Sequence, residues 1–197
     1  MTALPPRPVT LTGQYVALVP LAPDHLDDLF AAGGGDAEVW RWLTGPPPRT
    51  REELGGWMGR LLGDPAYVPF AVVHRASGRA VGWTTLLDVV VPDERLEIGW
   101  TWYGRDHWRS PVNTETKLLL LTYAFEGLGM GRVQLKTDHL NERSQAAIAR
   151  LGARREGVLR RHRRRVDGSW RDSVYFSLLA DEWPGAKARL TARLAEG

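Results

Sequence analysis

The 197-residue sequence contains no cysteine. This absence excludes disulfide frameworks, cysteine-ligated zinc, iron–sulfur clusters and acyl-cysteine intermediates. Long hydrophobic runs are also missing, since apolar stretches such as 118–121 are far shorter than the ~20 residues of a membrane helix. The first residues, Met-Thr-Ala-Leu-Pro-Pro-Arg-Pro, have no apolar segment typical of a signal peptide. We therefore expect a cytoplasmic protein with no membrane partner.

Several motifs that carry chemistry are absent as well. There is no phosphate-binding G-x-x-x-x-G-K-[ST] loop, no G-x-S-x-G nucleophile elbow and no H-E-x-x-H zinc motif. The five histidines show no spacing typical of metal ligands, so no metal is expected. The glycine-rich segment 127–131 follows a helical pattern instead of opening one, which is typical of a helix C-cap and turn.

Lysine is scarce, because only three of the 26 basic residues are lysine and the rest are arginine. The formal net charge is +3, and it is unevenly distributed. Residues 154–165 hold seven arginines and one acid, so the remainder of the chain has a net charge of −3. The arginines fit either a solvated strand face or a surface that attracts an acidic acceptor or phosphates.

The composition is that of an ordinary globular protein, with 43% hydrophobic and 25% charged residues. The length fits one domain spanning residues 1–197. Apolar periodicity and turn signals predict strands, then helices, then three strands in a meander, then strands alternating with helices. This order predicts the α/β (α+β) class, with a mixed sheet covered by helices on both faces.

The segment 96–102 is predicted to be a strand with two different faces. Leu96, Ile98, Trp100 and Trp102 alternate with Glu97, Gly99 and Thr101. A loop over 108–115 follows, and then a leucine-rich helix from about Thr114 to Gly127. The start of this helix favours a bound phosphate, while the alternative is a plain connection capped by Asn113.

Residues 132–160 and the hairpin after them resemble the GNAT N-acetyltransferase superfamily, in its RimJ/RimL-like branch, known for acetylating ribosomal-protein N-termini. The resemblance is carried by Asn-Glu-Arg-Ser at 141–144, Leu-Gly-Ala at 151–153, Arg-Glu-Gly-Val-Leu-Arg at 155–160, Asp-Gly at 167–168 and Arg-Asp at 171–172. It implies a sheet of about seven strands whose two central parallel strands, 96–102 and 133–137, splay apart to bind acetyl-CoA.

The resemblance also implies a set of cofactor-binding residues on the 96–102 strand, the following loop and helix, and the helix that starts at 141. They are Gly99, Trp100, Thr101, Trp102, Trp108, Arg109, Ser110, Val112, Asn113, Thr114, Lys117, Asn141, Arg143 and Ser144. The loop departs from the family's Q/R-x-x-G-x-G/A pattern, because Trp108, Pro111 and Asn113 occupy its defining positions. Proline donates no N–H, so the pyrophosphate would depend on the backbone of 112–114, with help from Arg109 or Ser110.

The reaction that the resemblance implies is direct acetyl transfer from acetyl-CoA to an amine. A backbone N–H on the 96–102 strand would polarise the carbonyl group, and Glu97 is the candidate base. Many family members use a tyrosine to protonate the thiolate, but Ile148 occupies that position here. Ser144 is the candidate donor to sulfur, and Tyr175 is a weaker alternative.

The acceptor site is expected among the helices at residues 24–63 and the hairpin tip, with Trp40, Trp42, Trp83 and Tyr175 as candidate contacts. Trp40 and Trp42 cannot share one helical face, so either one lies in the core and the other at a pocket wall, or both pack at the edge of the core. The acceptor is a protein N-terminus or a small amine, and a homodimer is a further expectation from the branch. The alternatives are a non-catalytic acyl-CoA-binding protein and a basic nucleic-acid-binding protein, although the aromatic interleaving of the latter is missing.

Overall fold

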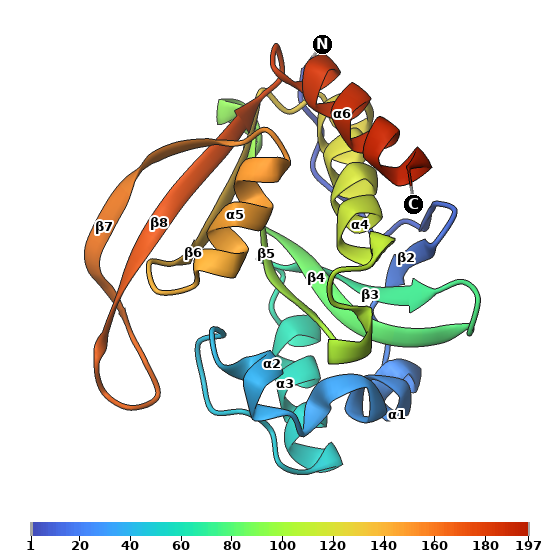
Figure 1. Ribbon diagram of the computed structural model, residues 1–197, viewed down its shortest axis with the longest axis vertical. Coiled ribbons are helices and arrows are strands. Elements are labelled where there is room, and N and C mark those ends of the chain that lie inside the picture. The colour runs from blue at the N-terminus through green and yellow to red at the C-terminus, as the bar shows by residue number, and fades with distance from the viewer. Residues whose placement is uncertain (1, 197) are drawn as a thin grey trace.

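The structure is a computed structural model and describes residues 2–196 (Figure 1). Within that range, eight strands form one mixed sheet in the order β1-β2-β3-β4-β5-β6-β8-β7. The strands are β1 (Leu11–Thr12), β2 (Val16–Pro20), β3 (Val68–His74), β4 (Arg79–Val90), β5 (Arg95–Tyr103), β6 (Arg132–Asp138), β7 (Arg154–Arg164) and β8 (Trp170–Leu179). The mixed sheet is confirmed, with one strand more than the approximate count expected.

Helices lie on both faces of this sheet, as expected. They are α1 (Leu26–Leu29), α2 (Ala37–Trp40), α3 (Arg51–Gly63), α4 (Pro111–Thr122), α5 (Glu142–Arg150) and α6 (Trp183–Ala195). Short 3-10 turns occupy Pro23–His25, Val91–Asp93 and Arg105–His107, and π-turns follow α1 and α4 at Phe30–Gly34 and Tyr123–Gly127. No helix in the described part of the chain is long and apolar enough to cross a bilayer.

Two hydrophobic clusters, one on each face of the sheet, form the core. Alternation along β3 sends Phe70 and Val72 to one cluster and Ala71 and Val73 to the other. Helices α4, α5 and α6 cover the first face, and α1, α2 and α3 cover the second (Figure 1). The second face is covered mainly at β3, β4 and the end of β5, which leaves the β6–β8–β7 part open for a site.

The sheet has one parallel pair among the strands of residues 2–196, β5 with β6, and it is paired over only three positions. These are Arg95 with Arg132, Leu96 with Val133 and Glu97 with Gln134. Beyond them the two strands separate, although β5 continues to Tyr103 and β6 to Asp138. The expected splay is therefore present, and it frees backbone N–H and C=O groups on the facing strand edges.

A β-bulge interrupts β5 at Trp100, which has a left-handed φ of 50°. The pairing with β4 passes from Thr85–Gly99 to Trp83–Trp102, so two residues of β5 lie opposite one residue of β4. Because the extra residue reverses the alternation, Trp102 packs in the cluster opposite to Leu96 and Ile98. The expectation that all four apolar residues share one face is wrong for this reason.

A buried carboxylate ties α4 to the first hairpin. Glu115 is 5% exposed and accepts the backbone N–H groups of Gln14, Tyr15 and Val16, each at 2.7 Å. A Cβ on Gly13 would overlap this carboxylate, which explains glycine at the turn. This contact anchors α4, whose first turn borders the candidate site.

Strand β7 forms one edge of the sheet and pairs with β8 alone. It carries six of the seven clustered arginines, all of them exposed, while Arg165 follows it in the hairpin. The expectation of a strand with a solvated basic face is met along most of its length.

Candidate active site

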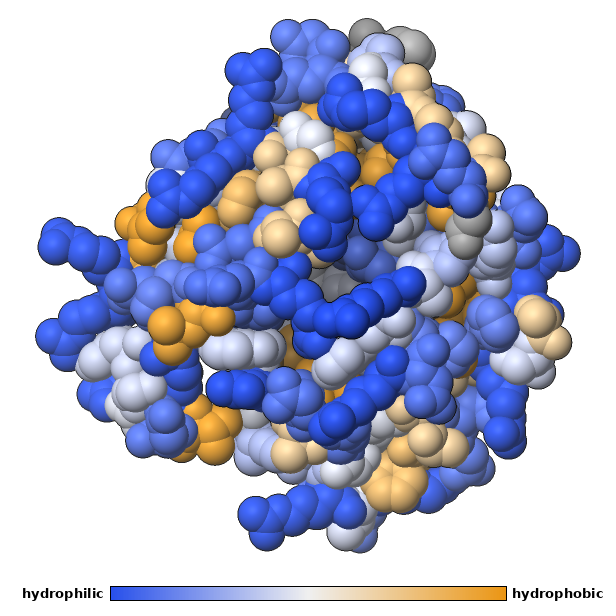
Figure 2. All heavy atoms as spheres, in the orientation of Figure 1, coloured by the Kyte–Doolittle hydropathy of each residue, from blue (hydrophilic) through white to orange (hydrophobic). Residues whose placement is uncertain are grey.

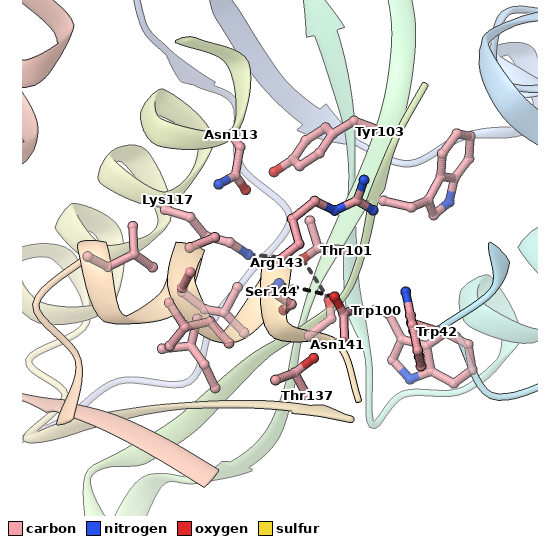
Figure 3. Close-up of a pocket in the computed structure, with 18 of the residues that line it drawn as sticks. Trp42, Trp100, Thr101, Tyr103, Asn113, Lys117, Thr137, Asn141, Arg143 and Ser144 are labelled. Carbon is pink, nitrogen blue, oxygen red and sulfur yellow. Dashed lines mark hydrogen bonds between the residues drawn. The ribbon is translucent and has the colours of Figure 1, made fainter. Parts of the chain in front are cut away.

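A cavity of about 860 Å³ lies where β5 and β6 separate. Its walls come from both strands, the first turns of α4 and α5, the segment after α2 and the end of α6. Figure 2 shows a recess near the middle of the face in view, and the side chains around this recess are mainly hydrophilic. A close-up of the lining is given in Figure 3.

Most of the predicted site residues line this cavity. They are Trp42, Glu97, Gly99, Trp100, Thr101, Trp102, Trp108, Arg109, Ser110, Asn113, Thr114, Lys117, Asn141, Arg143 and Ser144. Four predicted residues do not line it: Trp40, Trp83, Val112 and Tyr175.

Trp40 and Trp83 belong to the core and do not reach the cavity. Their side chains are 1% and 0% exposed, and their rings lie 5.6 Å apart in edge contact. The Nε1–H of Trp40 donates to the carbonyl oxygen of Gly33 at 3.0 Å. Neither Trp40 nor Trp83 is therefore placed to contact a substrate in the cavity, because packing such large aromatic rings in the core is more favourable than exposing them to water. Trp42 provides the pocket wall instead.

Helix α4 begins three residues earlier than expected. Ser110, not Asn113, is the N-cap, and its Oγ accepts the N–H of Val112 at 3.3 Å. Pro111 occupies the first helical position, where its fixed φ suits the helix and its missing N–H costs nothing. The departure from the family's glycine pattern therefore leaves a regular helix start. The Val112 N–H is already engaged and its side chain is buried, while Asn113 faces the cavity.

Helix α5 also points its first turn at the cavity. The side chain of Asn141 accepts the N–H of Ser144 at 3.1 Å, and both residues line the cavity (Figure 3). Arg143 lies with its guanidinium 3.8 Å from the ring centre of Trp108. Burial lowers the pKa of Arg143, the charge of Glu38 acts in the opposite direction, and the charges of Arg109 and Arg105 lower the pKa further.

The charge of the lining is strongly positive. It includes eight lysine or arginine side chains and a single carboxylate. The cations are Arg109, Lys117, Lys136, Arg143, Arg150, Arg163, Arg171 and Arg193, and the acid is Glu97. This excess of cationic side chains favours a polyanionic ligand. The N-termini of α4 and α5 add partial positive charge to the same space.

Glu97 is 1% exposed and is held by two donors from β6. Its Oε2 accepts Lys136 Nζ at 2.7 Å and Gln134 Nε2 at 2.9 Å. Oε1 points toward Gly99, since a Cβ on that glycine would lie 2.8 Å from it. One carboxylate oxygen is thus fixed, and the other faces the point where the strands part.

Lys117 is buried at the base of the same cavity. Its Nζ donates to Thr101 Oγ1 at 2.9 Å (Figure 3), and burial lowers its pKa to about 7. The bulge at Trp100 makes this contact possible, because it turns Thr101 toward α4. Strict alternation along the strand would instead put Thr101 on the same face as Glu97.

Several lining residues were not predicted from the sequence. Leu190, Arg193 and Leu194 come from α6, whose sequence shows only helical periodicity. Arg163 and Arg171 come from β7 and β8, far along the chain from the resemblance's cofactor motifs. The alternation of Arg171 with Ser173 and Tyr175 was the one available signal for a shared polar face.

The acetyltransferase (GNAT) domain family matches residues 16–154, which is more than half of the chain. The chain belongs to the GNAT acetyltransferase family. It is 34% identical over 159 residues to YdaF of Bacillus subtilis (strain 168), which carries the name of a ribosomal N-acetyltransferase, covering 80% of this chain and 79% of that protein. This GNAT chain is also 34% identical to a GCN5-related N-acetyltransferase from Brucella melitensis, with a TM-score of 0.93, covering 98% of this chain and 89% of that one.

The fold is also shared with a more distant solved structure. The structure of Mycobacterium smegmatis RimJ in complex with CoA-disulfide is 22% identical, with a TM-score of 0.78, covering 94% of this chain and 95% of that one. The predicted family and N-acetyltransferase class are thus confirmed, and nothing in the comparisons supports the non-catalytic or nucleic-acid-binding alternatives.

Proposed function

We propose that this chain transfers an acetyl group from acetyl-CoA directly to a primary amine, either a protein N-terminus or a small amine. One observation carries the proposal: β5 and β6 pair over three positions and then open into a basic cavity between the first turns of two helices. An extended ligand with amide groups can hydrogen-bond to the freed strand edges. Its phosphates can lie against the helix starts.

The donor set fits acetyl-CoA at both ends. At the pantetheine end, the backbone of Gly99, Trp100 and Trp102 supplies amide partners. At the phosphate end, Asn113 and Thr114 lie on the first turn of α4, which Ser110 caps, and Arg109, Arg143 and Lys117 supply positive charge. Asn141 and Ser144 close the site from α5. Trp108 acts as a wall, because its Nε1–H already donates to Tyr103 O at 2.9 Å.

Bound acetyl-CoA supplies the thioester carbonyl carbon that the amine attacks. In our proposal, Glu97 Oε1 accepts the proton that the amine gives up, directly or through a water. A backbone N–H of β5 beyond the paired positions polarises the carbonyl oxygen. As the C–N bond forms, the C–S bond breaks, and Ser144 Oγ donates a hydrogen bond to the leaving sulfur. Tyr175, the weaker alternative predicted from the sequence, has no such role in this proposal because it does not line the cavity.

The acceptor would enter from the side of Trp42 and Trp100, which lie at the far end of the cavity from Asn113 and Lys117 (Figure 3). The name of YdaF supports a protein N-terminus as one acceptor class. We also propose that residues 1–197 act as one domain, because α6 packs on α4 and completes the cavity. The homodimer and the cytoplasmic location stay predictions.

Calorimetry with acetyl-CoA tests the cofactor half of this proposal, and release of free thiol across a panel of amines tests the transfer half. We expect binding, followed by amine-dependent thiol release. Arg143→Gln should weaken acetyl-CoA binding by about tenfold, whereas the matched control Arg79→Gln changes an exposed arginine of β4 that pairs with Asp28 and should not. Absence of acetyl-CoA binding by the wild-type chain would overturn the proposal.

A further inference from the structure

Arg171 on β8 is a buried cation that the transfer reaction does not use. Its side chain is 8% exposed, and its Nε–H donates to Ser173 Oγ at 3.0 Å. The residue lines the large cavity and also an adjoining one of about 160 Å³, which lies between the segment 41–44 and the β7–β8 hairpin. The guanidinium therefore sits where the two spaces meet.

Arg171 forms no ion pair with any carboxylate in residues 2–196. Asp138, the carboxylate whose charge acts most strongly on Arg171, is already engaged. Its oxygens accept Arg165 Nε at 2.8 Å, Arg165 Nη2 at 2.9 Å and the N–H of Leu140 at 2.9 Å. Glu97 acts on Arg171 only through its charge at longer range, since it pairs with Lys136. The two terminal nitrogens of Arg171 thus have no counter-charge within ion-pairing distance.

The surroundings of Arg171 make this lack of a partner costly. Burial lowers its pKa, the charge of Asp138 acts in the opposite direction, and the charge of Arg163 lowers the pKa further. The neighbouring His162 responds to the same field: burial lowers its pKa, and so do the charges of Arg163, Lys136 and Arg171. A buried cation without a directly paired counter-charge is unfavourable, and an anionic ligand would relieve the cost.

Strand register places Arg171 on the sheet face that carries Glu97. Tyr175 lies opposite Lys136 and Ser173 opposite Asp138, so Arg171 continues this row past the end of β6. Glu97 lies beside Gln134, two residues before Lys136 on the same face. An acceptor whose amine reaches Glu97 would extend along this row toward Arg171.

We propose that Arg171, assisted by Arg163, binds a carboxylate of the acceptor, so that the preferred substrates are amines with a carboxylate close to the amino group. This inference rests on the proposed acetyl transfer. A planar guanidinium with two free N–H edges suits bidentate carboxylate binding. In the proposed function, the phosphates of acetyl-CoA bind elsewhere, at Arg109, Arg143 and the N-termini of the two helices.

Matched acceptors that differ only in charge test the inference. The first set has two peptide pairs: Asp-Ala-Ala amide is compared with Asn-Ala-Ala amide, and Ala-Asp-Ala amide with Ala-Asn-Ala amide. The second set compares γ-aminobutyrate with n-butylamine. The two sets distinguish a peptide N-terminus from a small amino acid as the source of the carboxylate. We expect the acidic member of at least one pair to have a kcat/KM higher by about 10- to 100-fold, mainly through a lower KM.

Variants of Arg171 test whether this residue causes the preference for the acidic acceptor. Arg171→Gln should remove most of the preference for the acidic member while retaining the hydrogen bond to Ser173, and Arg171→Lys should restore part of it. Because the readout is a ratio within one variant, partial misfolding lowers both rates and leaves the ratio unchanged. Arg160→Gln is the matched control, since Arg160 is an exposed arginine of the same hairpin that does not line either cavity.

Binding separates failure of this inference from failure of the proposed reaction. Calorimetry of the acidic and neutral peptides with the wild-type chain saturated with CoA should show tighter binding of the acidic one, whether or not transfer occurs. Equal affinities and equal kcat/KM values within every pair would overturn the inference while leaving acetyl transfer intact. Absence of thiol release with every amine, together with preferential binding of acidic peptides, would contradict the reaction and support the carboxylate site.

Discussion

Replacing Lys117 by methionine should stabilise the protein in a way that depends on pH. Lys117 is 6% exposed, donates only to Thr101, and forms no ion pair among the described residues. Burial lowers its pKa from 10.5 to about 7. Methionine fills a similar volume and carries no charge, so the substitution isolates the cost of keeping a cation in this position.

The sign and size of the effect follow from proton linkage. Below pH 7 the lysine is charged in both the folded and unfolded chains, and the full cost of burying the charge applies. Between pH 7 and 10.5 the unfolded chain keeps a proton that the folded chain has released, so wild-type stability rises with pH. At about 1.4 kcal/mol per pH unit, the full cost is about 5 kcal/mol. The variant should therefore be more stable near pH 6, with an advantage that falls by about 2 kcal/mol between pH 7 and 9.

Urea unfolding of the ligand-free wild type and variant at pH values from 6 to 9 measures this difference directly. Lys187→Met is the matched control, because Lys187 is half-exposed and pairs with Glu126 at 2.8 Å. Its stability difference from wild type should stay constant over the same range. A constant difference for Lys117→Met as well would refute the assignment of a buried lysine with a lowered pKa.

Three further predictions concern the core and the chemistry. Glu97→Gln should lower kcat by about 10²- to 10⁴-fold in the thiol-release assay while leaving the calorimetric Kd for acetyl-CoA within a few-fold; an unchanged rate would remove Glu97 from the mechanism. Glu115→Gln should cost about 2–5 kcal/mol in urea unfolding, because one amide oxygen cannot accept three backbone N–H groups, and a loss below 1 kcal/mol would contradict this account. Trp40→Ala should cost about 3–5 kcal/mol in the same assay, whereas Trp42→Ala should cost much less, because Trp42 lines the cavity instead of the core.

Elements with strong local signals were predictable from the sequence. The hairpin around Asp167 and Gly168 was one, although its loop differs from the two-residue turn that Asp-Gly favours. The N–H of Gly168 donates to the carbonyl oxygen of Arg165 at 3.0 Å, and Gly168, with a φ of 82°, ends a three-residue loop. Thr50 followed three residues later by Glu53 is also a local signal for a helix start, and in the structure the Oγ1 of Thr50 accepts the N–H of Glu53 at 3.2 Å. Asn141 was predicted as a site residue, and it lines the cavity while its side chain caps α5.

Features that depend on tertiary packing were not predictable. The bulge at Trp100 leaves no mark in the alternation of the strand, so the faces of Thr101 and Trp102 were assigned wrongly. Ser110 and Asn113 are both good caps, and the choice depends on Pro111, which occupies the first helical position. Whether Trp83 packs in the core depends on helices that the sequence does not position.

The arginines of β7 have a consequence for association between copies of the chain. An unpaired edge strand offers N–H and C=O groups to any other strand, and β7 also exposes Val158 and Leu159, at 36% and 49%. Two such edges meeting would bring rows of like charge together at strand spacing, well inside the ~8 Å screening length at physiological salt. The repulsion keeps the edge available to solvent and small ligands, and it weakens as ionic strength rises. The arginines that make the chain basic thus also oppose pairing of β7 with the β7 edge of another copy.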